Sequence, residues 1–317
     1  MYRTLRRALT AGAALAAPLL ALTACTPAGD DGTVQVLASF YPLQAVAQEV
    51  GGDRVTVSSL TPPGAEPHDV ELSPAQVAAT SAADLVVYQS GFQPAVDDAV
   101  TQAGPPHVVD AAEVTGLTSG APGGHDDEDE DHADEPHADD DGHDHDGLDP
   151  HVWLDPSRMP AVVDAVADAL SEVDPDGAAG YAANAAALTQ RFTELDEAYA
   201  AGLATCERRV VVVSHEAFGH LAERYDLEQV GISGVDPETE PSPARLREVG
   251  DTVRERGVTT IFFETLVSPK VAQTLAADLG VQTAVLDPLE GLTDETQDYF
   301  SVAEANLEAL RVALSCS

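Results

Sequence analysis

The sequence predicts an α/β protein with two lobes, each a mostly parallel sheet flanked by helices, joined by one long rigid helix. Strand-like and helix-like segments alternate on both sides of an acidic, histidine-rich stretch near the middle of the chain. Such alternation is typical of parallel sheets covered by helices on both faces. An alanine-rich segment over 175–204, which no proline interrupts after its first turn, predicts the joining helix.

The two lobes are assembled from similar patterns. For the N-terminal lobe, 34–156, we expect strands over 34–40, 54–60 and 84–90 and helices over 42–50 and 74–82. A helical linker over 157–205 includes a helix ending near residue 172 and the long helix. For the C-terminal lobe, 206–317, we expect strands over 208–214, 227–232, 259–263 and 282–286, with helices over 217–225, 243–256, 269–279 and 294–313.

The amino terminus reads as an export signal. Residues 1–24 combine the basic start "MYRTLRR" with an apolar stretch too short for a comfortable permanent anchor. They run into "LTAC" (residues 22–25), which resembles a bacterial lipobox, so we expect lipid on Cys25 and a flexible tether over 25–33. The alternative is an ordinary cleaved signal peptide with an incidental cysteine. Acylation would hold the protein on the extracytoplasmic face of the cell membrane.

Charge and cysteine content narrow the class of protein. The 317 residues carry a net charge of −40, which argues against nucleic acid or an anionic membrane surface as a partner. The excess of carboxylates suits a solvated surface or a protein that handles cations. In an exported chain, Cys206 and Cys316 predict one disulfide; two free thiols are the alternative.

Four side chains that can bind a metal follow predicted strands or adjoin the central insert. His68, His215 and Asp287 come after strands, and His151 lies where the insert rejoins the fold. Ligands of open parallel sheets bind beyond the carboxyl ends of the strands, so these residues are expected to converge between the lobes. Three imidazoles and a carboxylate form a complete four-coordinate set for Zn²⁺.

Other polar residues near these positions are not expected to bind the metal directly. Asp69, Asp149 and Glu216 are candidate acceptors for the free ring N–H groups of the histidines. Glu264 ends a strand and is expected to cap a helix or tune the site. His220 is interpreted as structural and His107 as incidental.

The motifs "PPGAEPHDVELSPAQ", "DPHVWLDP", "VVVSHEAFGHLAERYDL" and "LDPLEG" carry a family resemblance. From about residue 34 to the carboxyl terminus, the chain resembles the ZnuA-like zinc and manganese receptors of ABC transporters. The resemblance implies two lobes bridged by a rigid helix, with His68, His151, His215 and Asp287 as metal ligands. It also implies a receptor rather than an enzyme, acting as a monomer with an ABC permease and its ATPase as partners.

His215 bears on which metal the site prefers, and one difference from the family pattern bears on which group completes the metal shell. Manganese-type members resemble this chain but have a glutamate where His215 stands, and imidazole favours zinc, which leaves Mn²⁺ as the alternative. Some zinc members use a glutamate beside the first histidine; here Pro67 is in that place and Glu66 lies two residues away. Asp287, Glu66 or water therefore remain alternatives for completing the metal shell.

The insert, at about 114–147, contains a run of acidic residues and histidines without Lys or Arg over 124–146 and is expected to be disordered. One interpretation is that it captures metal weakly and raises the local concentration at the site; the other is a solvated linker. The accessory histidines are His125, His132, His137, His143 and His145.

Three other functions compete with the zinc receptor. A zinc hydrolase would use the three histidines, leave a position open for water and take Glu216 or Glu264 as base. No "HExxH" pair is present in the sequence. A manganese or iron receptor would share the architecture. A surface protein acting in cell adhesion or zinc buffering is the fourth reading.

Overall fold

Two parallel four-stranded sheets organise the chain in a computed structural model, which describes residues 32–117, 149–294 and 296–317. The strand orders are β2-β1-β3-β4 and β6-β5-β7-β8. Every pairing within them is parallel. The predicted fold class is confirmed. We call the sheet β2-β1-β3-β4 with its packed helices the first lobe, and the sheet β6-β5-β7-β8 with its packed helices the second lobe.

The elements have the following bounds. The strands are β1 (Val34–Ala38), β2 (Val55–Ser59), β3 (Leu85–Tyr88), β4 (Val108–Asp110), β5 (Val210–Val213), β6 (Glu228–Gly231), β7 (Thr260–Phe263) and β8 (Gln282–Val285). The helices are α1 (Tyr41–Gly51), α2 (Pro74–Ala82), α3 (Pro94–Ala103), α4 (Ala111–Val114), α5 (Met159–Val173), α6 (Ala178–Gly202), α7 (Gly219–Arg224), α8 (Pro243–Glu255), α9 (Lys270–Leu279) and α10 (Tyr299–Leu314). Short 3-10 turns are η1 (Gly52–Arg54), η2 (Val152–Leu154) and η3 (Pro175–Gly177).

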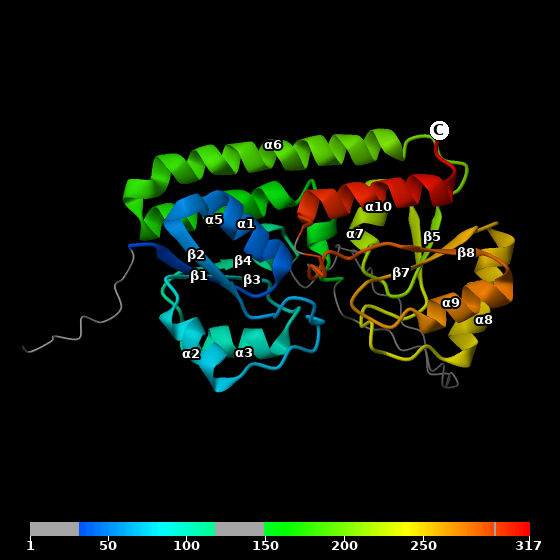
Figure 1. The fold of residues 1–317 in the computed structure, drawn as a ribbon, viewed down its shortest axis with the longest axis horizontal. Helices are drawn as coiled ribbons and strands as arrows, with labels where there is room; N and C mark the ends of the chain where they lie inside the picture. The colour runs from blue at the N-terminus through cyan, green and yellow to red at the C-terminus, as the bar shows by residue number, and fades with distance from the viewer. Residues whose placement is uncertain (1–31, 118–148, 295) are drawn as a thin grey trace, which may run out of the picture. The chain divides into compact units, whose positions relative to one another are not determined.

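Both faces of the sheets are covered by helices, which explains their continuous runs of valine. All four residues of β5 are buried, as expected for a strand in a parallel sheet with two covered faces. In the first lobe, Val36 and Val87 belong to the main core, whereas Leu37 and Val86 pack into a separate cluster on the opposite face. Figure 1 shows α1, α5 and α6 on one face of this sheet and α2 and α3 on the other.

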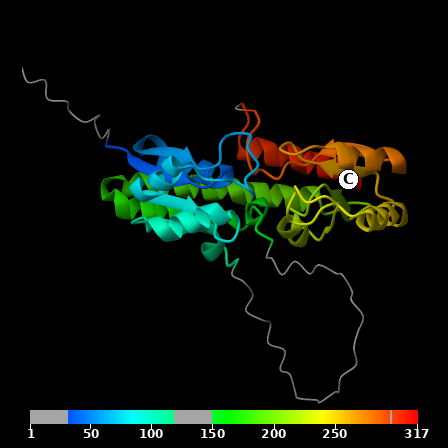
Figure 2. The same cartoon turned by 90° about the horizontal axis from the view of Figure 1, so that it is seen from below.

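Helix α6 runs along both lobes in both views (Figures 1 and 2). Its 25 residues correspond to a length of about 37 Å. Near its start, Asn184 Nδ2 donates to the carbonyl of Val50 at the end of α1. Near its end, Tyr199 donates its hydroxyl proton to the carbonyl of Ala303 in α10. The helix is thus anchored to an element of each lobe.

A tryptophan also connects the lobes, close to the carboxyl ends of the strands. Trp153 lies in η2, is 1% exposed, and donates from Nε1 to the carbonyl of Pro288 at 2.7 Å. The hydroxyl of Tyr299, at the start of α10, donates to the Trp153 carbonyl. A residue of the first lobe is therefore fixed to the loop that follows β8.

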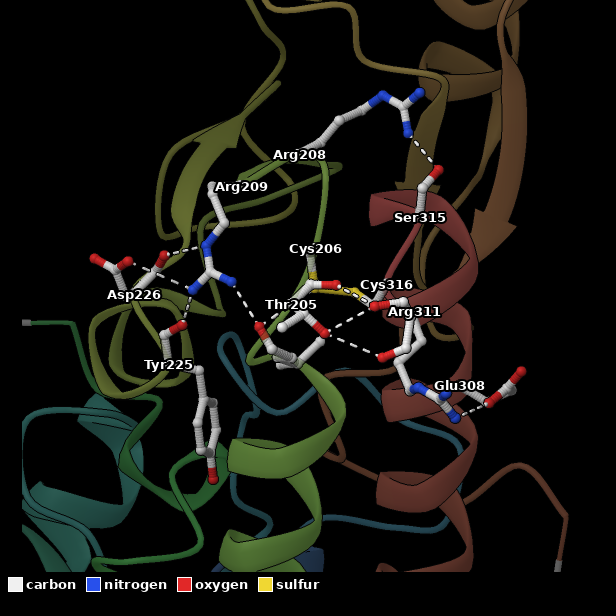
Figure 3. The surroundings of a disulfide bond; sticks show 12 residues. Thr205, Cys206, Arg208, Arg209, Tyr225, Asp226, Glu308, Arg311, Ser315 and Cys316 are labelled. Atoms are coloured by element: carbon white, nitrogen blue, oxygen red, sulfur yellow. Dashed lines mark hydrogen bonds and ion pairs between the residues drawn. A yellow bond between two sulfur atoms is a disulfide. The ribbon is translucent and has the colours of Figure 1, made fainter.

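A disulfide joins the chain after α6 to the chain after α10. Cys206 and Cys316 are bonded, and the same two residues form an isolated antiparallel bridge. Figure 3 shows the surrounding polar contacts, including the hydrogen bond from Arg208 to the Ser315 hydroxyl. The carboxyl terminus is thereby fixed beside the start of the second lobe.

The main differences from the sequence-based expectation lie in the helices, and α4 was not predicted. Helix α3 was not predicted, although Pro94 opens it and Gly104 ends it with a left-handed φ of 53°. Helix α10 begins at Tyr299 rather than 294, because Asp298 caps it through the backbone N–H of Ser301. Contacts make Thr33–Ser317 one compact unit, so the predicted lobe boundaries stay predictions.

The signal segment, Cys25 and the insert over 118–148 lie outside the described residues. Among the helices that are described, none is long and apolar enough to cross a membrane.

Candidate metal centre

Four side chains meet where the strands of the two lobes end. His68 follows β2, His151 precedes η2, His215 follows β5 and Glu290 follows β8. One donor atom from each lies within 4.8 Å of the others. The exposed fraction of the His68 side chain is 10%, and those of the other three are 0–1%. The structure therefore places two potential ligands from each lobe in one buried cluster.

The spacing of these atoms suits a tetrahedral ion. Oε1 of Glu290 lies 3.4 Å from Nε2 of His68, 3.2 Å from Nε2 of His151 and 3.6 Å from Nε2 of His215. Two ligands each about 2.0–2.1 Å from a tetrahedral zinc ion are about 3.3–3.4 Å apart. Within the described residues, the buried Nε2 atoms of His151 and His215 have no hydrogen-bond partner. Unsatisfied nitrogens pointing at one carboxylate fit a metal site.

Carboxylates behind the two buried histidines orient their rings. Nδ1 of His151 lies 2.7 Å from Asp149 Oδ1, and Nδ1 of His215 lies 2.8 Å from Glu264 Oε1. Ser214 also donates to Glu264. A ring that donates from Nδ1 keeps its lone pair on Nε2, the atom that faces the cluster. Of the expected acceptors, Asp149 takes this role.

Nε2 of His220 lies 2.9 Å from the carbonyl oxygen of Asp149, two residues before His151, whereas two other candidates lie away from the cluster. Glu216 pairs with Arg245, and His107 pairs with Glu172 at 3.6 Å.

The charges of the cluster are strongly coupled. Burial opposes protonation of His215, but the Glu264 carboxylate at Nδ1 and the nearby Glu290 carboxylate raise its pKa to about 10. At His151, burial lowers the pKa, but the carboxylates of Asp149 and Glu290 outweigh burial, so the pKa of His151 is raised. Burial raises the pKa of Glu290, yet the three imidazoles hold it well below its ordinary value. A metal ion entering this cluster competes with protons for His151 and His215.

Asp287, the carboxylate expected from the sequence, is not among the converging donors. Its Oδ1 accepts from the backbone N–H of Leu289 and its Oδ2 from the hydroxyl of Thr265, both at 2.8 Å. Leu289 has a left-handed φ of 60°, and this turn brings Glu290 to the cluster. The expected carboxylate lies three residues before the one that converges with the histidines, because the expectation took the first carboxylate after the strand. An Asp-Pro pair is a turn signal, and could have directed attention to the glutamate beyond it.

Glu66, the other acidic candidate, lies beside the cluster but outside the group of four. Its Oε1 accepts from the backbone N–H of His68 at 2.7 Å, which shapes the loop. Burial, with the Glu290 carboxylate nearby, raises the pKa of Glu66 to about 8. The five histidines of the insert, His125, His132, His137, His143 and His145, lie outside the described residues.

The fold and the site define a two-lobed α/β protein with a buried set of three histidines and one glutamate. The chain belongs to the ZnuA family of metal-binding solute receptors: a family model described as "Zinc-uptake complex component A periplasmic" matches residues 36–313.

Named relatives point in the same direction. "Zinc-binding protein AdcA" of Streptococcus pyogenes is 38% identical over 289 residues, covering 89% of this chain and 56% of the relative. The chain thus spans about half the length of that protein. "High-affinity zinc uptake system protein ZnuA" of Bacillus subtilis is 35% identical over 314 residues, 95% of this chain and 96% of the relative.

Solved structures share the whole fold. The Zn(II)-bound ZnuA-like domain of Streptococcus pneumoniae AdcA has a TM-score of 0.71 and 35% identity, over 89% of this chain and 99% of that one. The laminin-binding protein Lmb of Streptococcus agalactiae, described as bifunctional "with adhesin and metal transporting activity", has a TM-score of 0.74 and 33% identity over the same shares.

Proposed function

We propose that this protein binds Zn²⁺ outside the cytoplasm and delivers it to an ABC importer. The observation that carries the proposal is the convergence of three Nε2 atoms on one carboxylate oxygen between the lobes. Relatives named for zinc binding and zinc uptake support the same cargo. His68, His151, His215 and Glu290 are the proposed ligands.

The donor set favours zinc over manganese and a receptor over a hydrolase. Three imidazoles suit a borderline metal, whereas Mn²⁺ prefers more oxygen ligands. A catalytic zinc site keeps one position for water, and Glu290 occupies the position that water would take here. Tight, complete coordination suits a protein that holds an ion until a partner opens the site.

The setting is proposed on the same basis. An ABC permease and its ATPase would receive the ion from a monomeric receptor. Lipid on Cys25 would hold the receptor at the membrane, and a Streptococcus pneumoniae relative is named "Zinc-binding lipoprotein AdcA". The insert histidines would capture zinc weakly and pass it inward.

Titration of the protein with Zn²⁺ and Mn²⁺ against a competing chelator tests the proposal. We expect one tight zinc equivalent that Mn²⁺ does not displace. Glu290→Gln should weaken zinc binding by more than about 100-fold, because loss of an outer-shell partner alone costs about 10–100-fold. Asp287→Asn is the matched control, since it removes a charge outside the cluster while the amide oxygen can still accept from the backbone N–H of Leu289. Equal loss in both variants, or loss in neither, would reject this ligand set.

Adhesion is a second candidate, favoured by the likeness to Lmb. Binding of immobilised laminin by the wild type and by Glu290→Gln measures it. Laminin binding that survives in the zinc-deficient variant would establish adhesion as separate from transport.

A further inference from the structure

The connection between β3 and α3, residues 89–93, lies beside the first lobe's two histidines and is buried at three of its five residues. Three of its side chains are almost inaccessible: Gln89 is 1% exposed, Phe92 is 4% exposed and Gln93 is 1% exposed. Glutamine is normally a surface residue, and a buried amide is tolerated when it forms hydrogen bonds. The partners of these amides show what the connection does.

Gln93 holds both ends of the loop that carries His68. Its Nε2 donates to the hydroxyl oxygen of Thr61 at 2.9 Å and to the carbonyl of Pro67 at 3.1 Å. Thr61 begins this loop and in turn donates to the carbonyl of Ser39. Pro67 directly precedes His68. One amide therefore closes the loop and fixes the backbone immediately before the imidazole.

Gln89 makes the equivalent contact for His151. Its Nε2 donates to the carbonyl of Pro150 at 2.5 Å, and Pro150 directly precedes His151. Both histidines of the first lobe thus follow a proline. The carbonyl of each proline accepts a hydrogen bond from a buried glutamine, and both glutamines belong to the same five-residue connection. The two glutamines are four residues apart, so the connection sets the position of one imidazole relative to the other.

Phe92 lies between the glutamines and touches both rings. Its ring centroid is 4.7 Å from that of His68 and 6.1 Å from that of His151. It also packs on Trp153, with centroids 5.0 Å apart. The aromatic contact restricts the imidazoles from the side, while the amides restrict the backbone before them.

We infer that Gln89 and Gln93 are positioning residues, which hold His68 and His151 as one preorganised pair. The inference rests on the proposed function, because it concerns the same zinc site. A pair already in place loses little conformational freedom when the ion binds. Releasing either loop should therefore weaken zinc binding, mainly through faster dissociation.

Methionine substitution removes each amide while keeping the side-chain length. In Gln89→Met and Gln93→Met, we expect zinc affinity to fall by about tenfold, with most of the change in the rate at which excess chelator removes the ion. The visible spectrum of bound Co²⁺, which reports ligand geometry, should change in both. The unfolding midpoint of each metal-free variant is measured alongside.

Gln76→Met is the matched control. Its Nε2 donates at 2.8 Å to the carbonyl of Leu60, just before the same loop, but to no residue beside a histidine. We expect zinc and cobalt binding like the wild type, whatever its stability. Thr61→Val keeps the shape of the site and removes one acceptor of Gln93; faster zinc release is expected here too, even if Gln93→Met fails to fold.

Affinity, release rate and cobalt spectrum unchanged in Gln89→Met, Gln93→Met and Thr61→Val would overturn the inference while leaving the proposed function intact. Equal losses in Gln76→Met would also overturn it, because the effect would then be general destabilisation. Wild-type zinc binding that does not respond to Glu290→Gln would instead reject the proposed site and this inference with it.

Discussion

At the scale of single residues, each buried imidazole lies between two carboxylates with different tasks. Glu264 contacts Nδ1 of His215 from behind, whereas Glu290 faces its Nε2. Asp149 and Glu290 flank His151 in the same way. The carboxylate behind each ring orients it and increases the basicity of the nitrogen that faces the ion.

Removing the carboxylate behind His215 should weaken the site without removing a ligand. We expect Glu264→Gln to lower zinc affinity by about 10–100-fold, as measured by competition with a chelator. Glu216→Gln is the control, since Glu216 pairs with Arg245 rather than with a histidine. Unchanged affinity in Glu264→Gln would show that His215 is oriented by other contacts.

The sequence allowed three of the four converging residues to be predicted, for a physical reason. His215 lies just after β5, His68 lies in the loop that follows β2, and His151 ends the insert, so the rule that ligands bind beyond strand ends predicted all three. Glu290 was missed because the turn after β8 depends on side-chain hydrogen bonds of Asp287 and on the left-handed Leu289. Neither property appears in a pattern of apolar residues.

At the scale of elements, the two lobes are connected by α6, by its contact with α10 and by the disulfide between the segments that follow these two helices. The helix is fixed near its start by Asn184 and near its end by Tyr199. The Cys206–Cys316 disulfide then joins the segment after α6 to the segment after α10. Regular alternation made most strands and helices predictable, while α3 escaped because its pattern is short and begins immediately after the buried connection.

The disulfide should contribute to stability more than to zinc binding. It closes a loop with a sequence separation of 110 residues, for which the chain-entropy account gives about 4–5 kcal/mol. In the double variant Cys206→Ser, Cys316→Ser, we expect the free energy of unfolding from urea titration to fall by about 4–5 kcal/mol. We expect its zinc affinity to stay the same. Reduced wild-type protein is the control; identical unfolding of oxidised and reduced protein would contradict the prediction.

The ion pair before α6 should give a defined pH dependence. Hydrogen bonds from Arg54 and Tyr181 lower the pKa of Asp174 to about 2, against about 3.9 for an unperturbed aspartate. Because the folded pKa is the lower one, the stabilisation is complete above about pH 4 and is lost as pH falls towards 2. The difference in urea midpoint between the wild type and Asp174→Asn should be constant from neutral pH to about pH 4 and then shrink. A difference that grows on acidification would contradict this sign.

At the scale of the whole molecule, the site couples the two lobes. Each lobe provides two of the four converging residues, and Trp153 is hydrogen-bonded across to Pro288. A ligand that binds only the folded, assembled arrangement stabilises it by mass action. Zinc should therefore act as a clamp on the complete fold.

We expect zinc at about 1,000 times its dissociation constant to stabilise the protein by about 4 kcal/mol, which raises Tm by about 8–16 °C. Calorimetry with zinc and with excess chelator measures the shift. Glu290→Gln should show a much smaller one, and Asp287→Asn a shift like the wild type. If zinc raised the Tm of Glu290→Gln as much as that of the wild type, the stabilising ion would have to bind elsewhere.

The position of Trp153 has an optical consequence. It is the single tryptophan of the chain, it is buried, and its ring centroid is 5.1 Å from that of His151. An ion bound to His151, or loss of the Trp153–Pro288 hydrogen bond, would alter the surroundings of this one indole. We therefore expect the intrinsic fluorescence of the unlabelled protein to change when zinc is added and to return when a chelator removes it.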